Sequence, residues 1–161
     1  MMPGKPILAM LAIVVAIAIA AFFLVVTPAA AATPAEPGVH ITKMTIEPDG
    51  SDFNITVNYT TSFMTRIFSI FFGAKVVQPA IVDQVSVLGN VSLVSIDTSA
   101  QSAKLVAKDQ GQLSGGMYMY DRNAKFQVPV DTLEIKGSTV DRPITQNNSD
   151  SIPTFFYRPK Y

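Results

Sequence analysis

The chain of 161 residues contains no cysteine and only one histidine. The absence of cysteine excludes a disulfide framework, a thiolate nucleophile and a cysteine-ligated metal. The single histidine, His40, is too little for a zinc site, which needs at least three good ligands. A Ser-His-Asp arrangement would have to use His40, but no G-x-S-x-G elbow locates a nucleophile. We therefore predict no catalytic residue, no metal site and no cofactor, and we expect that the protein is not an enzyme.

An excess of charge of either sign is missing as well. Twelve basic side chains balance twelve acidic ones, so no basic field is available for nucleic acid. Neither of the glycine-rich motifs that bind nucleotide phosphates, G-x-x-x-x-G-K-[ST] and G-x-G-x-x-G, occurs. The acids are scattered and stand mostly in turn-like contexts, which turn formation explains. A secreted hydrolase that uses two of these carboxylates across a cleft stays a remote alternative.

The N-terminal segment carries the longest hydrophobic run. Residues 7–26 contain no charged side chain, and as a helix these 20 residues would span ~30 Å, the thickness of a bilayer core. As a single-pass anchor, the run follows Lys5, which favours a cytoplasmic N-terminus. As a secretory signal, it is followed by small residues at 29–32, although signal cores usually run only ~7–15 residues. The length slightly favours the anchor, and both interpretations place the rest of the chain outside the cytoplasm.

These features divide the chain into three parts. Residues 1–32 are predicted to be a transmembrane anchor or a signal peptide, residues 33–38 an Ala/Pro spacer, and residues 39–161 an extracytoplasmic β-rich domain. A domain of this length can bury a real core without disulfide bonds.

The domain shows mostly two-residue periodicity. In DFNITVNYTT (52–61), apolar residues alternate with polar ones, and the PDGS turn (48–51) joins this segment to VHITKMTIE (39–47). We predict a hairpin here and a second hairpin from residues 117–120 and 125–130. Further strands are predicted at 91–97, 102–108, 131–137 and 154–159, and a surface loop at 141–153. Such short strands indicate a mainly β fold, specifically an antiparallel β-sandwich-like domain with one or two short helices.

One segment, residues 63–72, has the periodicity of an amphipathic helix instead. Thr65, Arg66 and Ser69 would share a narrow polar arc, and the other side chains of the segment are apolar. Gly73 stands where such a helix would end. The helix would either plug the open face of a sheet or lie on a membrane or a partner, with Phe63, Ile67 and Phe71 as candidate contacts. Ten residues are too few to span a bilayer, and the single cation argues against strong attraction to anionic lipid.

Four asparagines begin N-x-[ST] motifs and are candidate N-glycosylation sites: Asn54, Asn58, Asn90 and Asn147. Composition predicts about one such motif by chance, so four is an excess, although strands and turns favour asparagine and threonine anyway. The alternation in residues 52–61 places Asn54 and Asn58 on the face opposite the apolar side chains, ~13 Å apart. Both are accessible only if that face meets solvent.

The sequence therefore favours a non-enzymatic cell-envelope protein, either membrane-anchored or secreted and in either case a candidate glycoprotein. Its β-rich domain would make structural or binding contacts with another envelope protein or with itself, and the N-terminal helix, if uncleaved, would contact the membrane. An alternative is a subunit of a pilin-like surface filament or of its membrane-anchored assembly. A hydrophobic helix followed by a β head is the plan of such subunits, but the acidic residue that they usually carry early in the helix is missing from residues 7–26.

Overall fold

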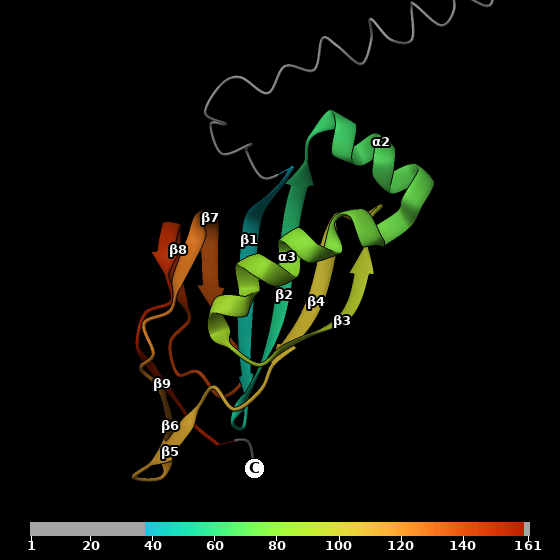
Figure 1. The fold of residues 1–161 in the computed structure, drawn as a ribbon. Coiled ribbons are helices and arrows are strands. Elements are labelled where there is room, and N and C mark those ends of the chain that lie inside the picture. Colours follow the sequence, from blue (N-terminus) through green and yellow to red (C-terminus); the bar gives the residue numbers. More distant parts are fainter. Residues whose placement is uncertain (1–37, 160–161) are drawn as a thin grey trace, which may run out of the picture. The chain divides into compact units, whose positions relative to one another are not determined.

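The computed structural model describes residues 38–159, which build a six-stranded sheet with helices on one face and a three-stranded sheet at one end (Figure 1). The predicted anchor or signal segment (1–32) and spacer residues 33–37 lie outside the described residues. The strand order of the main sheet is β3 (Val91–Asp97), β4 (Ser102–Ala107), β2 (Asp52–Thr61), β1 (Val39–Asp49), β7 (Lys125–Ile135) and β8 (Ile144–Ser151). The small sheet has the order β5 (Gln112–Ser114), β6 (Met117–Tyr120) and β9 (Phe155–Tyr157).

The centre of the main sheet is the predicted hairpin of β1 and β2. Its turn contains Gly50 with a φ of 63°, a left-handed conformation that glycine adopts without a steric penalty. All strand pairs are antiparallel except β1 and β7, which pair in parallel from Lys43 opposite Thr132 to Ile46 opposite Ile135. The main sheet is therefore mixed.

Two short α-helices and two 3₁₀ turns connect β2 to β3: α2 (Phe63–Phe72), η1 (Gly73–Val76), α3 (Gln78–Val85) and η2 (Ser86–Leu88). α2 begins where Ser62 accepts a hydrogen bond from the Thr65 backbone N–H at 3.3 Å, and it ends at Gly73 with a φ of 72°. α3 lies across one face of the main sheet (Figure 1). The Gln84 amide on α3 donates to the Val128 carbonyl at 2.6 Å, which joins the helix to β7.

The core lies between α3 and the sheet face that it covers. Alternate residues of β2 point into it, and α3 with η2 supplies the opposing side chains. The most deeply buried of these are Phe53, Ile55, Val57, Ile81, Val85 and Leu88. Where the main sheet meets the small sheet, the Phe53 ring of β2 packs against Tyr120, Phe155 and Tyr157, with ring centroids 5.4, 5.6 and 6.0 Å away. Burial of these apolar side chains is the main stabilising contribution to the fold.

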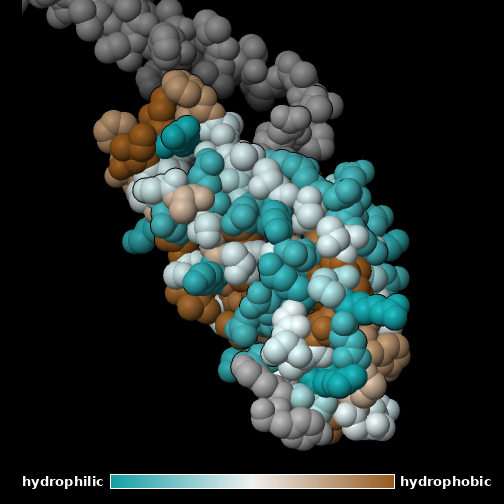
Figure 2. Space-filling model, turned by 180° about the vertical axis from the view of Figure 1, so that it is seen from behind, coloured by the Kyte–Doolittle hydropathy of each residue, from teal (hydrophilic) through white to brown (hydrophobic). Residues whose placement is uncertain are grey.

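The opposite face of the main sheet is polar, and no helix within residues 38–159 covers it. Figure 2 shows the molecule from this side, where hydrophilic and near-neutral side chains dominate and hydrophobic ones gather at the end that contains α2. The register places Asn58, Lys43, Thr132 and Asn147 in one row across four neighbouring strands. The same alternation that buries the apolar residues of β2 therefore turns its asparagines to this uncovered face.

The mainly β fold with two short helices is confirmed, but other details differ from the prediction. Because β1 and β7 pair in parallel and α3 covers the sheet, the domain differs from a purely antiparallel sandwich. The predicted second hairpin is wrong, since β6 pairs with β5 and β9, and residues 125–135 form one long strand beside β1. The predicted loop at 141–153 contains β8, whose polar sequence suits an edge strand that pairs with β7.

Candidate functional site

The helix α2 exposes an apolar surface. None of its residues is buried, and Phe63 and Phe71 each leave 77% of their surface exposed. Ile67, the third predicted contact, is half-buried. Four further side chains that the sequence did not single out complete this surface: Met64, Phe68, Ile70 and Phe72. The interpretation of this segment as a plug for the sheet is wrong, because α3 takes that place.

The exposed helix lies at the end of the domain where the chain enters β1. The Ser62 backbone N–H donates to the Gly38 carbonyl at 3.1 Å, and Val39 pairs with Thr61. A Cβ atom on Gly38 would stand 2.5 Å from the Thr65 hydroxyl oxygen, so a larger residue here would require the Thr65 side chain to shift. The start of α2 is thus fixed against the first described residue of the chain.

No single helix within residues 38–159 is long and apolar enough to cross a bilayer. Two helical segments, Phe63–Val76 and Gln78–Leu88, meet the length and composition criteria only together, with a bend of 61° between them. In the second segment, Ile81, Val85 and Leu88 are fully buried in the core, and Ala80, Val82 and Val87 are partly buried against it. Only the first segment therefore has an apolar surface free for another contact.

A cavity of about 300 Å³ lies between α2, the end of β2 and the turn that joins β3 to β4. Tyr59 forms part of its wall; the residue is 2% exposed, and its hydroxyl has no hydrogen-bond partner among the described residues. Among the described residues that line it, Arg66 is the one cation and none carries a carboxylate. Burial raises the pKa of the Tyr59 hydroxyl, and the Asp97 carboxylate raises this pKa further. The phenol therefore stays protonated and can donate a hydrogen bond.

The uncovered face of the main sheet carries several ion pairs. The Glu134 carboxylate lies 2.9 Å from the Lys43 amine and 3.3 Å from the Lys136 amine. These lysines, Lys43 above all, hold the pKa of Glu134 below its usual range, although partial burial opposes them. His40 lies 2.8 Å from an oxygen of Asp131, and both side chains are about half exposed. Within residues 38–159 no hydroxyl is hydrogen-bonded to His40, so the pair does not form a nucleophile-activating triad.

The four candidate glycosylation sites are all exposed. Asn54 and Asn58 project from β2 on the uncovered face, and Asn147 lies three strands away in the row of Asn58, roughly 14 Å across the sheet. Asn90 stands immediately before β3, where its backbone carbonyl accepts from the Lys108 N–H at 2.9 Å. The structure brings three of the four sites to one face.

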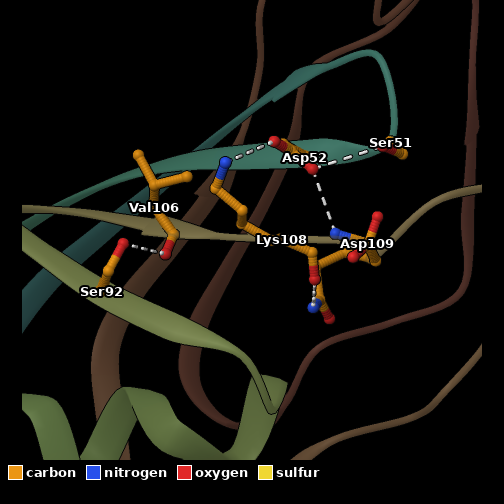
Figure 3. Close-up of polar contacts among 7 residues, drawn as sticks. Ser51, Asp52, Ser92, Val106, Lys108 and Asp109 are labelled. Atoms are coloured by element: carbon orange, nitrogen blue, oxygen red, sulfur yellow. Dashed lines mark hydrogen bonds and ion pairs between the residues drawn. The ribbon is translucent and has the colours of Figure 1, made fainter.

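A polar cluster at the other end of β2 has a structural role. The Asp52 carboxylate accepts the Asp109 backbone N–H at 3.0 Å and lies 3.9 Å from the Lys108 amine (Figure 3). The Ser51 carbonyl accepts two further backbone N–H groups, from Gln110 and Gly111. These bonds fix the segment after β4 against the β1–β2 turn and leave Asp52 engaged within the fold.

No group of three or more potential metal-ligating side chains of histidine, aspartate or glutamate occurs in the part of the chain that the structure describes. Comparison of the sequence with protein-family models and with curated proteins, and of the fold with solved structures, finds no match. The described residues thus present three candidate functional features: the apolar surface of α2, the adjacent cavity and the polar sheet face.

Proposed function

We propose that the chain is a non-enzymatic cell-envelope protein whose β-rich domain stands outside the cytoplasm and lies against the membrane through α2. The observation that carries this proposal is the exposed apolar surface of α2 at the end where the chain enters the domain. Large apolar side chains gathered on one exposed helix indicate a contact with lipid or protein, because their exposure costs free energy in water.

The length of the preceding chain favours lipid as the partner. The uncharged run at residues 7–26 is separated from Gly38 by 11 residues, 27–37. Even fully extended, such a linker reaches only about 40 Å at ~3.5 Å per residue. A membrane-anchored chain would thus hold α2 within reach of the bilayer surface. α2 is too short to span the membrane, but its apolar side chains suit a helix that lies in the interface.

We also propose that the polar sheet face points away from the membrane-bound helix and is the modified face of the domain. Asn54 and Asn58 are exposed there, which satisfies the access that glycan transfer requires. Glycans on these two residues would cover the centre of the sheet and would leave structural or binding contacts to other surfaces of the domain.

Labelling of a single introduced cysteine tests the location, because the natural chain has none. Ser95→Cys places a thiol on exposed β3 without touching an N-x-[ST] motif. A membrane-impermeant maleimide should label this variant in intact cells as strongly as after lysis. Labelling only after lysis would show that the domain lies inside the cell and would overturn the proposal. Intact mass and N-terminal sequencing of the same sample report cleavage and glycosylation.

A further inference from the structure

The helix α2 is oriented with its polar arc toward the domain. Thr65 and Ser69 are half-buried, and an added Cβ on Gly38 would stand only 2.5 Å from the Thr65 hydroxyl oxygen. Arg66 and Ser69 both line the cavity at the end of β2. The Ser69 hydroxyl also donates to the Thr65 carbonyl at 2.8 Å, within the helix itself. A surface helix ordinarily buries its apolar side and exposes its polar side, and α2 does the reverse.

The outward side of α2 is built from bulky apolar side chains. Six of them leave between 46% and 77% of their surface exposed: Phe63, Met64, Phe68, Ile70, Phe71 and Phe72. Four of the six are phenylalanines, and the ring centroids of Phe68 and Phe72 are 6.2 Å apart. The cations nearest to them in the chain are Arg66, which belongs to the polar arc, and Lys75 in η1. A partner on the outward side of α2 therefore meets hydrocarbon and aromatic rings without a charge.

The charges around α2 do not form a cationic surface. On one flank, the Asp97 carboxylate accepts two backbone N–H groups, each at 2.9 Å, in the turn that lines the cavity with Arg66. On the other flank, Asp131 lies 2.8 Å from His40, beside the end of β2 that leads into α2. Helices that bind anionic membranes carry many lysines and arginines on their polar face. Because carboxylates stand beside the few cations here, the described residues offer little attraction to anionic head groups.

We propose that α2 selects its lipid surface by the loose packing of the head groups rather than by their charge. This selectivity rests on the proposed contact of α2 with the membrane. Phenylalanine rings can enter a bilayer only through gaps between head groups, where the hydrocarbon is accessible. Since ion pairs add little to the binding free energy, docking depends on how many such gaps the surface offers. The preferred partner is thus a neutral bilayer that is strongly curved or rich in unsaturated chains.

Vesicles of defined composition test this selectivity on the full chain. A fluorophore on Met64→Cys is quenched by nitroxide-labelled lipid when α2 is docked, and the natural chain has no cysteine that would compete for the label. The chain is reconstituted into dioleoyl phosphatidylcholine, into the same lipid with about a third phosphatidylglycerol, and into tightly packed phosphatidylcholine with cholesterol. Phe71→Ser is measured in parallel, because a less apolar helix keeps docking within the measurable range if the anchored parent is fully docked.

Loose packing should raise the ratio of docked to undocked α2 by about tenfold over the cholesterol vesicles. Phosphatidylglycerol, or a change in ionic strength from about 0.05 to 0.5 M, should alter this ratio by less than about twofold. If Arg66 and Lys75 met the head groups instead, each would add about fivefold on the anionic vesicles. The matched control is Arg66→Gln with Lys75→Gln, which should dock like the parent on all three vesicles.

The selectivity and the membrane contact fail in different ways. Docking that rises with phosphatidylglycerol and falls with salt, or that is equal on loosely and tightly packed vesicles, overturns the selectivity and leaves the contact in place. Absence of quenching on every vesicle overturns the contact and the selectivity with it. Self-quenching between labelled chains, relieved by unlabelled chain, would identify a second copy as the occupant of α2 and would also overturn both. The cysteine-labelling result on location is independent of these outcomes.

Discussion

The exposed phenylalanines of α2 make a quantitative prediction about how the domain contacts a bilayer. Phe63 and Phe71 leave 77% of their surface exposed. With ~200 Å² per phenylalanine and about 25 cal/mol per Å², complete transfer to lipid would stabilise each by ~4 kcal/mol. A helix in the interface buries about half of that, so Phe63→Ser with Phe71→Ser should weaken docking by about 4 kcal/mol. This corresponds to a factor of about 10³ in the docking equilibrium.

The docking is measured on the full chain in phospholipid vesicles. A fluorophore on Met64→Cys, which is 57% exposed on α2, should be quenched by nitroxide-labelled lipid. The double serine variant should lose most of this quenching, whereas Val94→Ser with Leu113→Ser should keep it, since those side chains are 63% and 62% exposed on strands β3 and β5. Equal quenching in both double variants, or none in the parent, would refute a membrane contact through α2. Thermal unfolding checks that the exposed substitutions leave the fold intact.

Three further predictions concern the fold. Gly111→Ala should lower the free energy of unfolding by about 1–3 kcal/mol in urea titration, because the new Cβ would meet the buried Tyr157 hydroxyl; an unchanged midpoint would contradict this contact. Glu134→Gln should lower the free energy of unfolding by up to about 1 kcal/mol near neutral pH, after allowance for solvent screening. The lysines lower the pKa of this carboxyl in the folded state. Its contribution to the free energy of unfolding is therefore complete at pH values above the ordinary pKa of 4.5, and it is lost as the pH falls through the lowered pKa. Melting curves should therefore converge in acid, and a constant difference would exclude the ion pairs as the cause. Phe53→Leu should cost about 1–3 kcal/mol and the exposed Phe156→Leu less than about 0.5, and equal costs would argue against the aromatic cluster.

Local patterns predicted the parts of the fold that depend on local interactions. The alternation of β2 identified its strand and its polar face, which the structure leaves exposed, and Gly73 marked the end of α2. No local sequence pattern indicates which distant strands pair with each other. Residues 117–120 and 125–130 are close enough for a hairpin, but β6 pairs with β9, more than thirty residues further along the chain. β8 was missed because an edge strand with one uncovered face needs few apolar residues.

The candidate site could be predicted only in part for a similar reason. The periodicity of α2 shows that the helix has an apolar side, but it cannot show whether a sheet covers that side. The competing helix α3 covers the sheet instead, with Ile81 and Val85, and η2 adds Leu88, all three of which are buried in the core. From the sequence alone, Tyr59 would be interpreted as one more core residue of β2, and Arg66 as a single exposed cation. Only the tertiary structure brings them to the same cavity.

The parallel pairing of β1 and β7 determines when the domain can finish folding. Lys43 and Thr132, which are opposite each other, are separated by 89 positions in the chain. Because a chain is synthesised from its N-terminus, β2, β4 and β3 can assemble on one side of β1 before β7 is available to pair with its other edge. During that interval a central strand has an open edge, which is a site for pairing with other chains. The time at which β7 becomes available therefore limits both the rate of folding and the period of exposure to aggregation.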